Sequence, residues 1–231
     1  ANARANELRM ESRILADGDS ESAWHSAEAT MRPDATHARQ GRAMRFHVDM
    51  NHLAGEPNYP IGWPRTYLPI AKNQRDWRGW DFVEFRIYAD TSRERLPRTP
   101  LGFIVRSPDK PNSYHRPVHE AQKGQWAHVR IPIADMPDPA ECTAVQFFVA
   151  ESDYRHGDVL DFWIDDLALL RYAEPTIVAM RPAGRVHYAD AAARAAGIRP
   201  GCNLATASSI APGLRHLLRD RSRERQRPEQ L

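Results

Sequence analysis

The feature that most constrains the fold is a succession of short segments, between residues 77 and 172, in which apolar and polar residues alternate. This period of two is typical of β-strands that bury one face, because successive side chains point to opposite sides of a sheet. In segment 82–89 the apolar set is Val83, Phe85, Ile87 and Ala89. Segments 101–106, 126–133 and 145–149 repeat the pattern. Pro, Gly and Asp clusters separate the segments without an amphipathic helix, which predicts an all-β antiparallel β-sandwich of the jelly-roll kind.

The composition changes near residue 175. We predict a β-sandwich domain over residues 12–175 and, over 176–231, a linker or a truncated or disordered tail that is irregular or partly helical. The tail holds ten arginines and four acidic residues, which gives it a net charge of +6. Since the whole chain has a net charge of +2, residues 1–175 have a net charge of 2 − 6 = −4. Nucleic-acid binding would need this charge interleaved with aromatic residues, and the tail offers only Tyr188. We therefore expect no nucleic-acid partner.

Hydrophobicity, cysteine content and the first residues narrow the class of protein further. No apolar run approaches the roughly 20 residues that span a bilayer, so no membrane partner is expected. Only Cys142 and Cys202 are present, without partners at zinc-site spacing, which leaves a single disulfide open. The chain starts at Ala1 with no charged start and apolar run, as a mature chain does after loss of its signal peptide. We therefore expect an extracellular or periplasmic protein.

Three stretches carry a resemblance to a known class of domain. They are Asp17-Gly18-Asp19 followed by Trp24, the segment WDFVEFRIY at 80–88, and the segment FWIDDL at 162–167. In their order and spacing, residues 17–172 resemble the carbohydrate-binding modules of the galactose-binding-like jelly-roll class, which are attached to polysaccharide lyases and glycoside hydrolases. The resemblance implies non-catalytic binding of a polysaccharide or another glycan, with an associated catalytic domain as a second partner.

Asp165 points to a structural metal. In a regular strand it shares a face with Leu167 and Leu169, which directs its carboxylate towards the core, where an unpaired charge is costly. The resemblance implies a calcium ion near the first and last strands, and calcium takes about six to eight oxygen ligands. The predicted calcium ligands are Asp17, Asp19 and Asp165, with Glu21 and Asp166 as further candidates. The alternative is a set of solvated carboxylates at a strand end.

The most unusual loop is 58–65, in which two prolines and a glycine restrict the chain. Aromatic rings stack on the C–H faces of sugars, and planar polar groups bind hydroxyls in pairs. Tyr59, Trp63 and Arg65 are therefore predicted ligand-binding residues. The alternative for Trp63 is a packing role at one end of the sandwich.

Two further sets of residues are candidates for ligand binding. They are Tyr114 and His115, in a polar stretch between two prolines, and Glu84, Arg86 and Tyr88. The second set and Gln146 are expected to face away from the core and to line a concave sheet face. The alternative is an ordinary solvated face with paired charges. An acidic glycan would make Arg65, Arg86 and Arg106 the natural partners of its carboxylates or sulfates.

Common catalytic motifs are missing. The sequence lacks Gly-x-Ser-x-Gly, His-Glu-x-x-His and phosphate-loop patterns, and we assign no catalytic residue. A glycoside hydrolase needs two carboxylates across the scissile bond, and Glu84 with Glu151 would meet only through a favourable topology. A polysaccharide lyase needs a base beside a group that neutralises a uronate. Tyr114, His115 and Arg116 are residues of the types that supply these two groups. Both enzyme classes stay open as alternatives. A third alternative is an accessory β-sandwich that binds no sugar, in which case the aromatic residues of loop 58–65 would be buried.

Overall fold

The computed structural model describes residues 10–19, 23–53, 62–173, 176–179, 184–211 and 213–218. The chain divides into two compact units. The larger comprises Ile14–Trp77 and Glu84–Ala168, and the smaller comprises Arg78–Val83 with the described residues up to Arg13 and from Leu169 onward. Two residues considered above, Glu21 and Tyr59, lie outside the described part of the chain.

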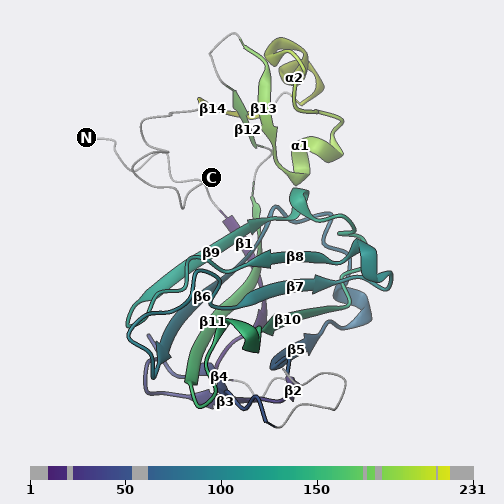
Figure 1. Cartoon of the computed structure of the whole chain (residues 1–231). Helices are drawn as coiled ribbons and strands as arrows, with labels where there is room; N and C mark the ends of the chain where they lie inside the picture. Colours follow the sequence, from purple (N-terminus) through teal and green to yellow (C-terminus); the bar gives the residue numbers. More distant parts are fainter. Residues whose placement is uncertain are drawn as a thin grey trace, which may run out of the picture. The chain divides into compact units, whose positions relative to one another are not determined.

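A sandwich of two antiparallel sheets forms most of the described chain (Figure 1). Sheet A has the order β3 (Thr30–Asp34), β4 (Ala43–Asp49), β11 (Val159–Tyr172), β6 (Phe82–Thr91) and β9 (Trp126–Pro132), and β1 (Met10–Ala16) also pairs with β11. Sheet B has the order β2 (His25–Ala27), β5 (Arg65–Pro69), β10 (Ala144–Phe148), β7 (Gly102–Arg106) and β8 (Tyr114–Pro117). The connections include the 3₁₀ turns η1 (Lys72–Gln74), η2 (Lys110–Asn112), η3 (Ile133–Asp135) and η4 (Glu151–Asp153). The predicted antiparallel β-sandwich is confirmed.

The core lies between the two sheets and contains the alternating residues that the sequence indicated. The apolar residues of segment 82–89 are fully buried, whereas its polar residues between them are partly exposed. Phe85 of sheet A contacts Phe103 and Phe147 of sheet B, with ring centroids 5.2 and 5.1 Å apart. Burial of each such ring contributes roughly 1.5–3 kcal/mol, so this aromatic cluster joins the sheets firmly.

Strand β11 contains a β-bulge that changes the position of Asp165. Ile164 pairs with Met44 and both are buried, and the next core residue is Leu167, so two residues separate consecutive core positions instead of one. Asp166 has a φ of 52°, in the left-handed region that Asp tolerates better than most residues. Asp165 is buried, at 9% exposure. The regular alternation that placed it on one face with Leu167 is nevertheless wrong, because the bulge shifts the phase of the strand.

The smaller unit contains a three-stranded sheet and two short helices. Its sheet has the order β13 (Val186–Ala189), β12 (Thr176–Ala179) and β14 (Arg215–Leu218). Helix α1 (Ala191–Ala195) is capped by Asp190, and α2 (Leu204–Ile210) is capped by Asn203. The small apolar core consists of Val186, Ala189, Ala193, Ile198, Leu204 and Ala207. The helices fit the partly helical tail expected from composition, whereas the sheet was not predicted.

Asp81 is a buried polar anchor of the smaller unit, at 2% exposure. One carboxylate oxygen accepts hydrogen bonds from the Ala191 N–H (2.7 Å) and the Tyr188 hydroxyl (3.2 Å). The other oxygen accepts the Tyr172 N–H at 3.0 Å. Burial and the charge of Asp81 raise the pKa of Tyr188, so its hydroxyl stays protonated and donates. Asp81 therefore joins the end of β11 to the start of α1.

No helix of the described residues is long and apolar enough to cross a membrane. Cys142 is buried, Cys202 is half-buried, and both thiols are free. Burial raises the pKa of the Cys142 thiol to about 12, so this thiol stays protonated and unreactive at neutral pH.

Candidate functional site

Sheet B presents an outer face whose residues align across all five strands. Partners in adjacent strands project to the same side of a sheet. The first row of partners is His25, Tyr67, Gln146, Ile104 and His115. The second row is Ala27, Arg65, Phe148, Gly102 and Pro117. The alternate residues Thr66, Phe103 and Phe147 are fully buried, so both rows face outward. We call these two rows, with Trp63 and Arg106, the outer face of sheet B.

Aromatic rings cover part of the second row. The Phe148 ring lies across Gly102, since a Cβ built on Gly102 would lie 2.1 Å from a ring carbon. Trp63 packs edge-on against Phe148, with centroids 5.3 Å apart and planes at 71°. The Arg65 guanidinium lies 5.4 Å from the Trp63 ring. Trp63 is 43% exposed, which argues against a packing role and leaves its ring open for stacking.

Two carboxylates fix the backbone that carries Trp63. The Trp63 N–H donates to Glu28 Oε2 at 2.8 Å, and the Gly62 N–H donates to Glu151 Oε2 at 2.6 Å. Glu151 is 4% exposed, so its hydrogen bond is shielded from water. Because both N–H groups are held, the backbone at the indole is ordered in advance, which reduces the entropy lost on binding a ligand.

The middle of the first row combines a phenol ring, an amide and a guanidinium. The His25 ring stacks on Tyr67, with centroids 5.1 Å apart and planes at 22°. The Arg106 guanidinium lies 5.0 Å from the Tyr67 ring and donates a hydrogen bond to Gln146 Oε1. This polar centre beside aromatic rings suits a ligand that has both hydroxyl groups and apolar C–H faces.

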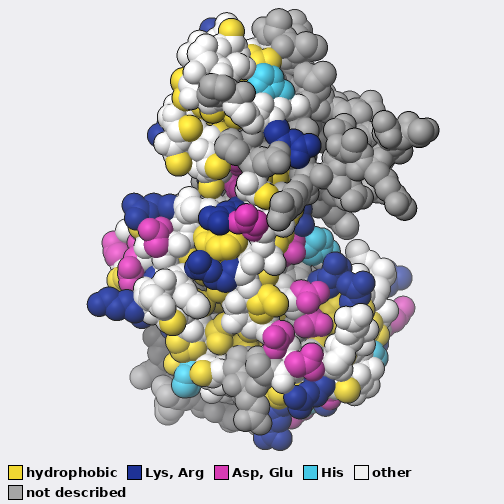
Figure 2. Space-filling view, turned by 180° about the vertical axis from the view of Figure 1, so that it is seen from behind, with side chains coloured by type: hydrophobic (Ala, Val, Ile, Leu, Met, Phe, Trp, Pro, Cys, Tyr) yellow, Lys and Arg dark blue, Asp and Glu magenta, His cyan; other side chains and the backbone are white. Residues whose placement is uncertain are grey.

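The outer face of sheet A differs, because its charged groups are paired with one another. Glu84 accepts hydrogen bonds from His128 and Arg130, both at 2.8 Å, and Arg86 bonds Asp166 at 3.1 Å. Burial by itself raises the pKa of Glu84. The hydrogen bonds from His128 and Arg130 outweigh this effect and hold the pKa of Glu84 below its ordinary value. Figure 2, seen from behind Figure 1, shows acidic and basic side chains lying close together over the larger unit. This arrangement is the solvated face with paired charges considered above.

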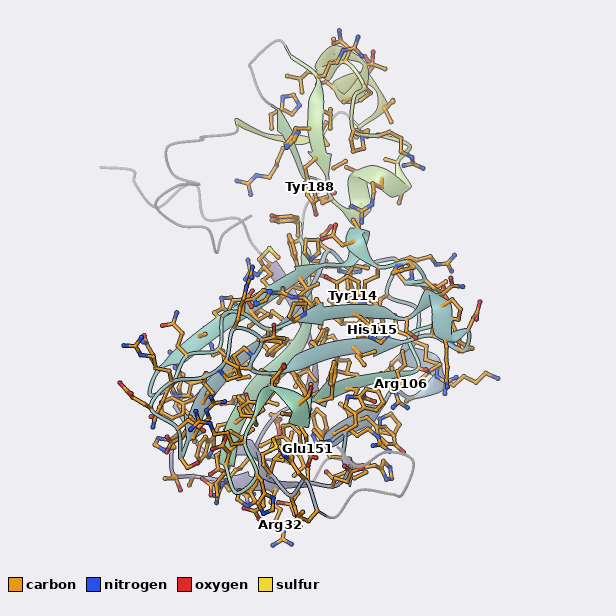
Figure 3. The ribbon with its side chains drawn as sticks, viewed as in Figure 1. Arg32, Arg106, Tyr114, His115, Glu151 and Tyr188 are labelled. Carbon is orange, nitrogen blue, oxygen red and sulfur yellow. The ribbon has the colours of Figure 1, made fainter. Side chains whose placement is uncertain are left out.

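The structure brings some predicted ligand-binding residues together and separates others. Trp63, Arg65 and His115 lie on the outer face of sheet B, and Figure 3 shows His115 with Arg106 on the neighbouring strand. Tyr114 pairs with the core residue Val105, so its side chain points away from that face. Tyr59 cannot be placed because it lies outside the described residues.

The remaining candidates, Glu84, Arg86 and Tyr88, belong to β6 in sheet A. Tyr88 stacks on His37, with ring centroids 4.3 Å apart. The expectation that Gln146 lines the same face as these three residues is wrong, because β10 lies in sheet B. Period-two alternation indicates that a residue faces outward, but it does not indicate from which sheet.

Neither catalytic set considered from the sequence converges within the described residues. Glu84 lies on the outer face of sheet A, whereas the buried Glu151 holds a backbone N–H beside sheet B. His115 points to the opposite side of β8 from Tyr114 and Arg116. Although His115 and Arg116 are adjacent in the sequence, their side chains therefore do not form a base paired with a uronate-neutralising arginine.

Three residues that carry rings on this face, His25, Tyr67 and Phe148, were not predicted from the sequence. A signal was present for Tyr67, since it alternates with Thr66 and Leu68 in a short strand. The signal became meaningful only once the pairing of β5 with β2 and β10 was known.

The predicted calcium ligands are occupied by local hydrogen bonds. Asp17 accepts the Asp19 N–H at 3.2 Å, and Asp19 accepts the Arg42 N–H at 3.0 Å. Asp165 accepts the Asp166 N–H at 2.9 Å, and burial raises the pKa of Asp165. Within the described ranges, no group of three or more His, Cys, Asp or Glu side chains is arranged to hold a metal ion. A carboxylate that accepts a hydrogen bond can still coordinate a cation, so the calcium site that the resemblance implies stays a prediction.

Thermal unfolding with and without a chelator tests calcium directly. If calcium binds at Asp17, Asp19 and Asp165, chelation should lower the melting temperature, and the Asp165→Ala protein should lose that response. A ligand that binds only the folded state stabilises it by mass action. An unchanged melting temperature with excess chelator would contradict the calcium site predicted from the sequence.

Comparisons with known proteins bear on the fold. No family model and no curated protein matches the sequence. Among solved structures, part of an exo-β-agarase has a TM-score of 0.52 at 9% identity, covering 70% of this chain and 26% of the agarase chain. A family 11 carbohydrate-binding module from Clostridium thermocellum, in complex with a β-1,3-1,4-mixed-linked tetrasaccharide, has a TM-score of 0.43 at 15% identity, covering 68% and 94%. A module specific for non-crystalline cellulose has a TM-score of 0.43 at 16% identity, covering 68% and 93%.

The likeness to the agarase concerns the fold alone, and this chain spans about a quarter of that enzyme's length. The fold and the site together define the class of structure. It is a two-sheet, jelly-roll β-sandwich with an aromatic, arginine-bearing outer face on one sheet.

Proposed function

We propose that this chain is a non-catalytic carbohydrate-binding module and that the outer face of sheet B binds the glycan. One observation carries the proposal: the Trp63, Phe148 and Tyr67 rings share this face with Arg65 and Arg106. Aromatic rings stack on the C–H faces of pyranoses. Guanidinium groups bind pairs of oxygen atoms, as the vicinal hydroxyls of a sugar provide.

The dimensions of the face suit a chain of sugars. Five strands spaced about 4.8 Å apart make a surface roughly 20 Å wide, which accommodates several sugar units. Because the two rows of residues run across the strands, we expect the glycan chain to lie along the rows and to cross the strands as well. The fixed backbone at Trp63 limits the entropic cost of binding.

The resemblance in the sequence supports the same proposal, as does the occurrence of the fold in part of an exo-β-agarase. From the resemblance we also propose an associated glycan-active catalytic domain as a partner and an extracellular or periplasmic location. Fractionation of cells that produce the complete protein would test the location.

The binding proposal is tested by measuring affinity for a panel of neutral and acidic polysaccharides. Reducing-end and unsaturated-product assays are run on the same samples. We expect binding without product formation. Turnover would favour the polysaccharide lyase or glycoside hydrolase alternative, and the absence of both binding and turnover would favour the accessory domain.

A further inference from the structure

Among the described residues, no carboxylate pairs with the positively charged guanidinium of Arg106. The two groups in contact with its guanidinium, the Gln146 Oε1 atom and the Tyr67 ring, are both neutral. On the same face, Arg65 differs because Glu28 lies 3.8 Å from it. Arg106 is therefore the stronger candidate for attracting an anion to this face.

The arginines on the outer face of sheet A provide a contrast. Arg86 is paired with Asp166 at 3.1 Å, and Arg130 is paired with Glu84 at 2.8 Å. A guanidinium beside a carboxylate is neutralised in place and attracts a second anion only weakly. Of the arginines that the sequence suggested for an acidic glycan, Arg86 is thus unsuitable and Arg106 is suitable.

Gln146 holds the Arg106 guanidinium with a neutral group. Its side chain is 0% exposed, and its Oε1 atom accepts the hydrogen bond from Arg106. Its Nε2 atom has no hydrogen-bond partner among the described residues. Because Gln146 is fully buried, it does not meet a ligand at the surface and acts instead by fixing the position of Arg106. Gln146 is therefore a positioning residue for Arg106.

We propose that the outer face of sheet B binds an anionic sugar unit, one that carries a carboxylate or a sulfate, and that Arg106 contacts the anion. This inference rests on the proposed carbohydrate-binding function. A planar guanidinium binds carboxylate or sulfate oxygens through parallel hydrogen bonds. Arg106 is half-buried, which limits screening of its charge by solvent. The Tyr67 ring beside it supplies an apolar contact for the sugar ring.

The test uses polymers that differ only in charge. Polygalacturonate is compared with its methyl ester, and a sulfated galactan with its desulfated form, alongside neutral agarose, xylan and β-glucan. The protein should bind one charged polymer at least roughly tenfold more tightly than its neutralised form. Added salt should reduce this preference. A preference within the first pair identifies a carboxylate ligand, and one within the second pair identifies a sulfate.

Variants assign the preference to Arg106. Arg106→Gln should remove the preference, so that the charged and the neutralised polymer bind with equal affinity. Gln146→Glu keeps Arg106 but places a carboxylate beside it, and should cancel the preference in the same way. The matched control is Arg32→Gln, an exposed arginine of β3 in sheet A (Figure 3), which should leave the preference unchanged.

Circular dichroism and thermal unfolding establish that each variant is folded. Three results would contradict the proposed anionic ligand while leaving carbohydrate binding in place. They are equal affinity for the charged and neutralised polymers, tight binding to neutral polymers alone, and a preference that survives in Arg106→Gln. Binding to none of the polymers would contradict the proposed function itself.

Discussion

Trp63→Ala should weaken glycan binding by about 2 to 3 kcal/mol, roughly a 30- to 150-fold loss of affinity, while the protein stays folded. The indole is 43% exposed and packs against Phe148, so it offers the largest accessible ring on the outer face of sheet B. Its removal takes away the stacking surface and the edge that supports Phe148. Isothermal titration with the tightest-binding polysaccharide of the panel measures the loss.

Two further variants make this prediction specific to the face. In Gly102→Ala, the added Cβ would displace the Phe148 ring, so affinity should fall although Trp63 is intact. In Tyr88→Ala the change lies in sheet A, where Tyr88 stacks on His37, and affinity should be kept. If Tyr88→Ala loses affinity and Trp63→Ala does not, the glycan binds sheet A instead.

Asp81→Ala should lower the free energy of unfolding of the smaller unit by about 3 kcal/mol. The substitution removes the acceptor of three hydrogen bonds and leaves the Tyr188 hydroxyl and two backbone N–H groups without it. Buried donors without partners carry their full desolvation cost. Denaturant unfolding followed by circular dichroism measures the change, and hydrogen exchange at the Ala191 N–H locates it.

Asp153→Ala is the matched control, because Asp153 is exposed and its loss should change the free energy of unfolding by less than about 0.5 kcal/mol. Asp81→Asn keeps one acceptor oxygen and should be intermediate. Equal effects of Asp81→Ala and Asp153→Ala would show that the hydrogen bonds to Asp81 do not stabilise the unit.

The class of fold followed from the sequence because burial of one strand face is a local property. Phe85 and Ile87 alternate with Glu84 and Arg86, and this pattern alone distinguishes a half-buried strand from a helix. The alternation failed at Asp165, where a bulge residue with a left-handed backbone shifts the phase. Aspartate is compatible with that conformation but does not require it, so the bulge left no clear signal in the sequence.

The smaller unit was less predictable. Its apolar core is made largely of alanines and single aliphatic residues, which give weak periodicity. Its strands are four residues each, too short for alternation to stand out from composition. A carboxylate near the start of β6, Asp81, supplies contacts that no pattern within residues 176–231 could reveal.

The sequence by itself determined the outward side chains of regular strands such as β6, and it predicted that loop 58–65 carries residues suited to sugar binding. Only the tertiary structure decided which outward residues share a face, because strand order depends on contacts between segments far apart in the chain. It placed Gln146 beside Tyr67 and Arg106, and Glu84 on the other sheet with its own cations. Charge pairing then distinguished the two faces, since the sequence lists the arginines and carboxylates but the fold determines which of them meet.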